Sequence, residues 1–206
     1  IKTKDPTEEF EATSEITTGS FGTKSAGLAF GGPLANNKNI AYRLVLRKDN
    51  SDGFRKNLYL KRSDTSRKDE TTSRLKIDWE MDEKTSVKLL ISQVDLDDPA
   101  DIWTLDGSLN TLSDRPGMDS QKTNSYGLKI FHNFAGFDLQ SLTSSTDTSV
   151  VFSYDADWGN ADSWTPFIYD YFSETLRDRK TFSQELRLVS NEANLDEEQK
   201  IEWVFG

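Results

Sequence analysis

Short segments in which apolar and polar side chains alternate are the feature that most constrains the fold of this chain. The clearest segment covers residues 181–190. Its apolar positions share one parity and its polar positions share the other: Phe182, Leu186 and Leu188 against Ser183, Glu185 and Arg187. Because successive side chains of a β-strand point to opposite faces, the pattern predicts a strand with one apolar face and one charged face.

Nine segments of the chain show this alternation. They cover residues 8–18, 23–31, 40–48, 70–80, 85–94, 122–132, 137–145, 181–190 and 201–206. Polar or glycine-rich stretches separate them, which favours turns between antiparallel neighbours. The sequence therefore predicts an all-β, antiparallel, up-and-down fold with about nine strands.

The connections between these segments nearly alternate between short and long. Turns are expected at residues 19–22, 31–39, 81–84, 133–136 and 191–200, and long connections at 49–68, 95–121 and 145–180. The turn at 19–22 is the exception to the alternation. Short turns at one end and long loops at the other are typical of an outer-membrane β-barrel, whereas a soluble sandwich has no reason for such asymmetry. The pattern thus predicts part of a transmembrane β-barrel.

Composition narrows the alternatives to this fold. Only 34% of the 206 residues are hydrophobic, which suits either a disordered chain or strands that are apolar on one side only. An aromatic content of 11% argues against disorder. The sequence has no run of about 18 apolar residues, so it contains no candidate for a membrane-spanning helix. A net charge of -10 argues against a nucleic-acid partner, which would require a basic surface.

Four aromatic residues share the parity of the apolar face and lie beside expected short turns. They are Phe30, Trp79, Phe137 and Trp203. Aromatic rings favour the boundary between hydrocarbon and water, so these residues are interpreted as one membrane-interface girdle. The alternative is that they belong to the core of a sandwich.

One long connection is rich in aromatic side chains set among acids. Residues 154–172 contain five candidate ligand contacts: Trp158, Trp164, Phe167, Tyr169 and Tyr171. Such rings could stack on a sugar or on the ring of a siderophore. The alternative is that they pack the loop onto its neighbours, since packing and recognition aromatics look alike in sequence.

The sequence contains no recognisable catalytic constellation, so no enzyme activity, cofactor or metal is predicted. Its single histidine, His132, has no cysteine to complete a zinc site and no evident triad partners. Two acidic clusters raise a calcium hypothesis. They are Asp95, Asp97, Asp98 and Asp101, and separately Asp155, Asp157, Asn160 and Asp162. Neither matches the helix–loop–helix calcium pattern, which favours solvated loop acids.

The polar parity of the strands carries charges of both signs. The positions expected to face inward are Arg43, Arg47, Arg74, Lys76, Asp78, Glu80, Lys129, Asp138, Glu185 and Arg187. In a closed barrel these side chains would contact water or an internal plug.

Several short motifs, in this order and spacing, resemble the first barrel strands of TonB-dependent outer-membrane receptors. The motifs are FGT at 21–23, GGPL at 31–34, AYRL at 41–44, SDGF at 51–54, FSQELRL at 182–188 and WVFG at 203–206. The resemblance extends over nearly the whole chain. It implies active uptake of an iron–siderophore complex, a vitamin or an oligosaccharide at the bacterial outer membrane.

The resemblance also implies which parts and partners belong to such a receptor. Barrels of this type have about 22 strands and a plugged lumen. Residues 1–206 would then form the amino-terminal part of the barrel, without the plug domain and the later strands. The expected partners are outer-membrane lipid, the receptor's own plug, the TonB complex through a segment outside this chain, and a small-molecule or glycan ligand.

Two other interpretations stay open at this point. One is a soluble all-β carbohydrate-binding module that uses the loop at 158–171. The other is an outer-membrane barrel enzyme, which would need a histidine-based site that this sequence does not provide. The first alternative requires a second sheet against the apolar face, where Leu44, Leu75 and Leu186 lie.

Overall fold

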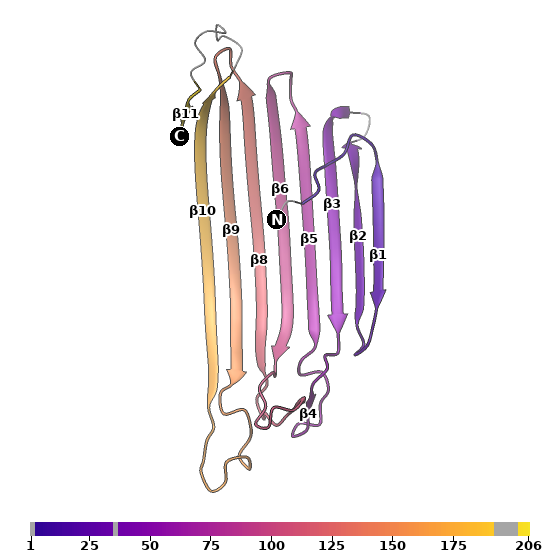
Figure 1. The fold of residues 1–206 in the computed structure, drawn as a ribbon, viewed down its shortest axis with the longest axis vertical. Helices are drawn as coiled ribbons and strands as arrows, with labels where there is room; N and C mark the ends of the chain where they lie inside the picture. The colour runs from indigo at the N-terminus through magenta and orange to yellow at the C-terminus, as the bar shows by residue number, and fades with distance from the viewer. Residues whose placement is uncertain (1–2, 35–36, 192–201) are drawn as a thin grey trace.

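A computed structural model describes residues 3–34, 37–191 and 202–206, and these residues form a tall, open β-sheet (Figure 1). The strands of the sheet are β1 (Glu11–Thr18), β2 (Lys24–Leu34), β3 (Asn37–Ser51), β5 (Lys68–Glu80), β6 (Thr85–Ala100), β8 (Gly117–Asn133), β9 (Phe137–Asp155), β10 (Phe172–Ser190) and β11 (Val204–Phe205). Two further strands, β4 (Lys56–Asn57) and β7 (Asn110–Thr111), lie in the loops. Among the described residues, no helix is long and apolar enough to cross a membrane.

The nine strands of the sheet follow the order of the chain. The order is β1-β2-β3-β5-β6-β8-β9-β10-β11, and every neighbouring pair is antiparallel. This confirms the predicted all-β, up-and-down architecture. The short connections lie at one end of the sheet and the long connections at the other (Figure 1). The exception is the turn between β1 and β2, which is short but lies at the same end as the long connections. We call these the turn end and the loop end.

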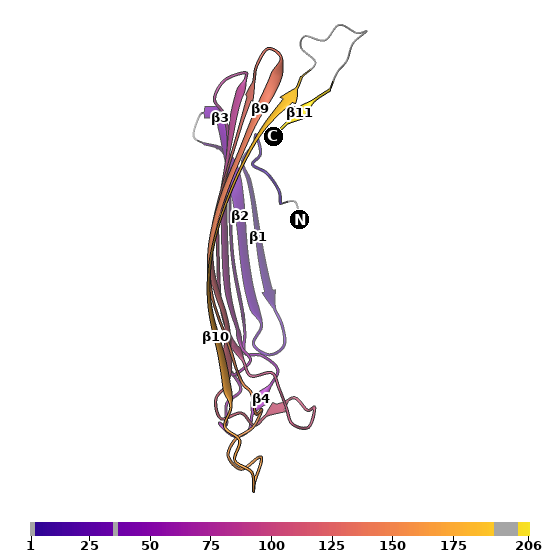
Figure 2. The same ribbon diagram turned by 90° about the vertical axis from the view of Figure 1, so that its left-hand side faces the viewer.

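The sheet is a single curved layer with a polar concave face and a convex face that is largely apolar towards the turn end and polar towards the loop end. Figure 2 shows its curvature, with the amino-terminal segment on the concave side. Lys76 on β5 donates hydrogen bonds to Asp5 (2.6 Å) and to the carbonyl oxygen of Thr3 (3.0 Å) in that segment. The strand register places all ten of the side chains that were expected to face inward on this concave face.

The convex face has no second layer against it. In the described part of the chain, Ala100 is the one hydrophobic residue that is buried. Phe182 and Leu186 on the convex face of β10 are 70% and 54% exposed, while Leu44 and Leu75 are partly covered by their neighbours in the sheet. A sandwich core, which the soluble-module interpretation requires, is therefore not formed by these residues.

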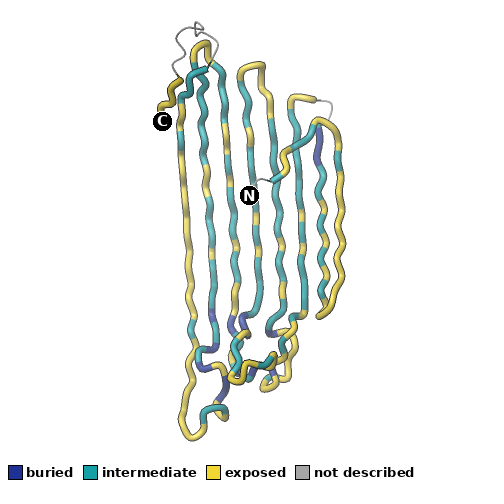
Figure 3. The backbone as a smooth tube through the Cα atoms, in the orientation of Figure 1, coloured by how far each residue is buried: buried dark blue, intermediate teal, exposed yellow. Residues whose placement is uncertain are grey.

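Most of the fully buried residues are polar and lie near the loop end of the sheet (Figure 3). They are Asn57, Thr65, Asp101, Thr111, Ser113, Ser153, Asp155, Asp157 and Asn160. Buried polar groups need hydrogen-bond partners, so this end of the molecule depends on specific polar contacts.

Strand boundaries differ from the expected ones mainly at the loop end. Strand β9 runs to Asp155 and β10 starts at Phe172, whereas the expected strands covered only residues 137–145 and 181–190. The added segments contain many hydroxyl and charged residues and lack the apolar alternation. They pair residue by residue all the same, for example Thr148 with Arg179. Pairing of the backbone, which does not depend on hydrophobic parity, extends these strands.

The expected turn at residues 31–39 is also too long. Strand β2 continues through Pro33 to Leu34, with a shift of register at that point, and β3 begins at Asn37. A bulge of this kind lets a strand accommodate proline. The expected turn at 191–200 and residue Ile201 of the last expected strand lie outside the described residues, apart from Asn191.

Candidate functional site

Three long loops lie together at the loop end of the sheet. They are residues 52–67 between β3 and β5, 101–116 between β6 and β8, and 156–171 between β9 and β10 (Figure 1). The first two loops are joined by a short parallel pairing, in which Lys56 of β4 lies opposite Asn110 of β7 and Asn57 lies opposite Thr111. Strands of two residues carry no periodic pattern, so the sequence did not predict this pairing.

A buried hydrogen-bond network fixes the first loop to the second. Asn57 donates through Nδ2 to Asp101 Oδ2 (2.9 Å) and to the carbonyl oxygen of Ser113 (2.8 Å). Thr111 Oγ1 donates to the same Asp101 oxygen (2.7 Å). The amide of Leu60 donates to Asn57 Oδ1 (2.8 Å), so both ends of the Asn57 side chain are used. We call Asn57, Asp101 and Thr111 the loop joint.

The third loop is fixed to the second by similar contacts. Asn160 Nδ2 donates to the carbonyl oxygen of Leu112 (2.8 Å), and the amide of Asp114 donates to the carbonyl oxygen of Gly159 (2.9 Å). Asp157 holds the base of the loop, because its Oδ2 accepts from the amide of Tyr171 (2.8 Å). The three loops therefore form one connected body.

Burial raises the pKa of Asp155, which lies at the end of β9 beneath the third loop. The nearby negative charges of Asp157 and Asp114 add to the rise, and the backbone amide of Asp157 opposes it. Asp155 Oδ1 accepts a hydrogen bond from that amide (3.2 Å). Its ionised form is thus less favourable here than in water.

Four of the five candidate ligand contacts form a chain of ring contacts in the third loop. Trp164 and Tyr169 meet edge to face with ring centroids 5.6 Å apart, and Tyr169 also contacts Phe167 (6.3 Å) and Tyr171 (5.9 Å). Trp158 lies apart from this chain, at a position with a positive φ of 62°. The structure therefore brings together Trp164, Phe167, Tyr169 and Tyr171, which we call the aromatic chain.

The members of the aromatic chain differ in their surroundings. Trp164 donates through Nε1 to the carbonyl oxygen of Asp157 (3.1 Å), so it packs the loop. Phe167 and Tyr171 are exposed, and the neighbouring Ile168 is almost fully exposed. The same loop thus contains a ring that packs against its backbone and rings that are exposed to solvent. The exposed rings offer apolar faces to a ligand.

Arg115 of the second loop is a neighbour that the sequence did not reveal. Its guanidinium lies over the ring of Phe172, 5.3 Å from the centroid, and forms an ion pair with Asp170. The contact joins residues far apart in the chain. A cationic group beside exposed aromatic rings adds polar recognition to this surface.

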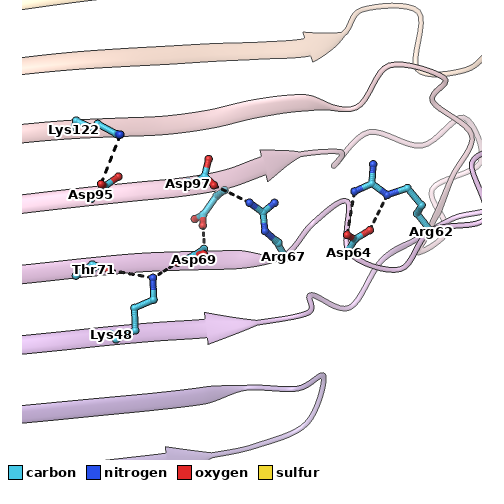
Figure 4. Close-up of polar contacts among 10 residues, drawn as sticks. Lys48, Arg62, Asp64, Arg67, Asp69, Thr71, Asp95, Asp97 and Lys122 are labelled. Atoms are coloured by element: carbon cyan, nitrogen blue, oxygen red, sulfur yellow. Dashed lines mark hydrogen bonds and ion pairs between the residues drawn. The ribbon is translucent and has the colours of Figure 1, made fainter.

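The first acidic cluster is dispersed in the structure. Asp95 faces Lys122 (3.8 Å) and Asp97 faces Arg67 (2.8 Å), as Figure 4 shows. Asp98 accepts a hydrogen bond from the amide of Asp69 (2.7 Å), and Asp101 belongs to the loop joint. Burial and the adjacent Glu70 raise the pKa of Asp98, against opposing effects of the Asp69 amide and Lys68.

The second acidic cluster lies in the third loop, where its side chains bind backbone amides. Asp157 Oδ1 accepts from Gly159 (3.1 Å), and Asn160 Oδ1 accepts from Asp162 (3.0 Å). Within the described ranges, no three side chains of His, Cys, Asp or Glu lie close enough to hold a metal ion. The contacts that are present serve the conformation of the loop.

His132 lies at the turn end, far from the loops along β8. Its Nδ1 is 2.8 Å from Thr85 Oγ1, and its ring contacts that of Phe134 with centroids 4.3 Å apart. Both contacts hold the ring against its neighbours on the sheet.

The aromatic residues of the convex face lie at two levels. Trp79 and Phe137 are at the turn end, and Phe137 contacts Trp203 with ring centroids 6.4 Å apart. Phe30 lies elsewhere, because β2 continues for four residues beyond it. Through successive strand pairings, Phe30 falls in one row with Leu44, Leu75, Ile91, Tyr126, Ser145 and Phe182. That row contains two aromatic residues, Tyr126 and Phe182, which the expected girdle did not include.

No family model matches the chain, and no curated protein sequence matches it. A solved structure has a similar fold: one chain in the structure described as the FpvAI–pyocin S2 complex, with a TM-score of 0.64 and 17% sequence identity. The similarity covers 91% of this chain and 25% of the other, so this chain spans about a quarter of the length of its structural neighbour. The nine-stranded antiparallel sheet thus has the fold of part of that longer chain.

Proposed function

We propose that this chain forms part of the barrel wall of a TonB-dependent outer-membrane receptor that takes up a scarce ligand. The candidate ligands are an iron–siderophore complex, a vitamin or an oligosaccharide. The observation that carries the proposal is a single-layer sheet whose convex face exposes large apolar side chains. In water such a face would favour association, whereas in a bilayer it would contact hydrocarbon.

The aromatic residues support this placement. Trp79, Phe137 and Trp203 would lie at one membrane interface, and Phe30, Tyr126 and Phe182 at the other. On β3 the convex apolar positions run from Ile40 to Leu46, a distance of roughly 20 Å along the strand. That is close to the height of the apolar band of outer-membrane barrels, about 25 Å.

The two faces and two ends of the sheet then have distinct roles. The loop end would face outside, and the turn end would face the periplasm. The concave face, with its mixture of charges, would line the lumen and contact the plug domain that such receptors contain. Coupling to the TonB complex would depend on parts of the receptor beyond residues 1–206. We propose no catalysed reaction.

The aromatic chain is the part of this region that we propose for ligand contact. Phe167 and Tyr171 present exposed rings, and Tyr171 follows Asp170 of the Arg115–Asp170 pair in the chain. The loop that carries them is fixed to its neighbours. Trp164 would support these rings from within the loop, Tyr169 would add a further exposed ring, and Trp158 would contribute separately. A fixed, exposed aromatic surface suits stacking against a sugar or a planar chelating ring.

The membrane placement can be tested by fluorescence quenching, since the chain has no native cysteine. Leu186→Cys and Glu185→Cys put single labels on adjacent residues that face opposite sides of β10. In vesicles of phosphatidylcholine with brominated acyl chains, we expect strong quenching of a fluorophore at position 186 and weak quenching at 185. Equal quenching at both positions would rule out a lipid-facing convex surface.

A further inference from the structure

The convex face changes from apolar to polar between adjacent rows of paired residues. The last apolar row contains Leu44, Leu75, Ile91, Tyr126 and Phe182. Two residues closer to the loops, the same face presents Leu46, Ser73, Gln93, Asn124, Asp147 and Lys180. Residues two apart in a strand are separated by about 7 Å, so the apolar surface ends abruptly on most strands.

The following row combines charges of both signs with two hydroxyl groups. It contains Lys48, Thr71, Asp95, Lys122, Ser149 and Asp178, one from each of β3, β5, β6, β8, β9 and β10. Figure 4 shows the part of this row on β3 to β8, with its ion pairs. We call the charged residues of these two rows the charged belt: Lys48, Asp95, Lys122, Asp147, Asp178 and Lys180.

In each ion pair of the belt the lysine is the more exposed partner. In the Lys122–Asp95 pair the side chains are 73% and 55% exposed, and in the Lys180–Asp147 pair 80% and 48%. Lys48 is likewise more exposed than its partner Asp69. Long lysine side chains extend beyond the shorter aspartates, so a group approaching this surface meets ammonium groups first.

Two of these ammonium groups, those of Lys122 and Lys180, are held only loosely by their partners, whereas Lys48 contacts Asp69 closely and donates to Thr71 Oγ1 (3.0 Å). The Lys122–Asp95 and Lys180–Asp147 distances are 3.8 and 3.2 Å, and both pairs are exposed. Exposed pairs of this kind contribute little to stability. Their lysines can therefore exchange an aspartate for another anion at small cost.

We propose that the charged belt binds the phosphate groups of lipid headgroups through Lys48, Lys122 and Lys180. The inference rests on the proposed function, because it requires the apolar rows to lie in the bilayer with the belt directly above them. Three strand spacings separate Lys48 from Lys122, about 14 Å. Two strand spacings and an offset of two residues along the strand separate Lys122 from Lys180, about 12 Å. The lysines thus offer separate contacts along the rim rather than one pocket. The aspartates between them offset the repulsion among the lysines.

The test compares two triple variants of the protein folded in detergent micelles. The first carries Lys48→Gln, Lys122→Gln and Lys180→Gln. The control carries Lys68→Gln, Lys88→Gln and Lys129→Gln, which removes the same charge from the concave face. Native mass spectrometry measures binding of a diphosphorylated lipid A and of the same lipid without phosphates. Far-UV circular dichroism establishes that both variants keep the sheet.

We expect the belt variant to bind the phosphorylated lipid about tenfold more weakly, with the control close to the parent protein. Equal losses in both variants, unchanged binding by the belt variant, or equal affinity of the parent for both lipids would overturn the inference. Quenching of the label at position 186 separates the two proposals. Strong quenching with unchanged lipid binding rejects the belt alone, whereas absent quenching rejects the membrane placement and the belt with it.

Discussion

Asp101 shows how much of this molecule depends on single polar side chains. One of its carboxylate oxygens accepts hydrogen bonds from Asn57 in the first loop and Thr111 in the second. All three side chains are buried. A buried polar group that loses its partner is costly, so the joint is more sensitive to substitution than a surface contact.

Asp101→Ala is expected to loosen the first two loops. The substitution removes the shared acceptor and should lower their local free energy of opening by about 2 kcal/mol. Hydrogen exchange of the amides at 52–67 and 101–116 measures the effect. The matched control is Asp162→Ala, which removes an exposed loop carboxylate. Comparable exchange in the two variants would show that the joint does not hold the loops.

Acid is expected to stabilise the third loop through Asp155. Because its pKa is raised in the folded protein, the folded loop binds a proton more tightly than the unfolded chain does. The free-energy cost of burying the ionised Asp155 carboxylate is therefore fully present above the raised pKa. This cost disappears as the pH falls through that pKa and the carboxylate takes up a proton. Hydrogen exchange at 156–171, corrected for intrinsic rates, should show slower opening at mildly acidic than at neutral pH. Asp155→Asn should remove this dependence, and a dependence that persists in the variant would assign it to other groups.

Substitutions at two residues of the aromatic chain can distinguish a ring that holds the third loop together from a ring that is only exposed on its surface. Trp164→Ala should accelerate exchange throughout residues 156–171, because it removes ring contacts and the hydrogen bond to Asp157. Phe167→Ala should leave exchange nearly unchanged, because its ring is exposed. Intrinsic tryptophan fluorescence checks that the fold is retained. An equal effect of both substitutions would contradict this division of roles.

The strands show where sequence is informative and where it is not. Alternation located the nine strands of the sheet because one face of each is apolar near the turn end. It failed beyond Ser145, where Thr146 and Thr148 face the concave side and Asp147 the convex side. With both faces polar, parity carries no information, although the backbone pairs continue. The loop joint was also invisible, because asparagine, aspartate and threonine are common in any loop.

The paired part of β9 that the sequence missed can be tested with proline. Thr148 lies between β8 and β10, paired with Thr123 on one side and Arg179 on the other. Thr148→Pro should destabilise the protein by about 3 kcal/mol or more, because proline removes a ladder donor and clashes in a central strand. Thr148→Ala keeps the amide and should have a much smaller effect. Denaturant unfolding followed by circular dichroism compares the two, and tolerance of proline would indicate a loop there.

At the scale of the whole molecule, the described residues form a sheet without an extensive buried hydrophobic core. They bury one hydrophobic side chain fully, so ladder hydrogen bonds and the surrounding medium must hold the sheet. A bilayer would supply that medium. The sheet pairs the backbone polar groups of its inner strands, and the apolar side chains of its convex face would contact lipid. Stability should therefore respond to substitution in opposite ways on the two faces.

Leu128→Arg and Ser144→Arg test this difference between faces. Leu128 lies on the convex face of β8, whereas Ser144 lies on the concave face of β9. The arginine at position 128 should reduce the free energy of folding into vesicles by about 2–4 kcal/mol, the cost of a charge near the middle of the bilayer. The arginine at 144 should have little effect. Equal costs on both faces would conflict with a lipid-facing convex surface.

The loop joint also separates what the loops must keep from what they can change. Several side chains of the described loops connect one loop to the next, among them Asn57, Asp101, Thr111, Asn160 and Arg115. Residues nearer the tips, such as Phe167 and Ile168, take no part in those connections. New binding specificities could therefore arise by exchanging tip residues, without rebuilding the platform on which they stand.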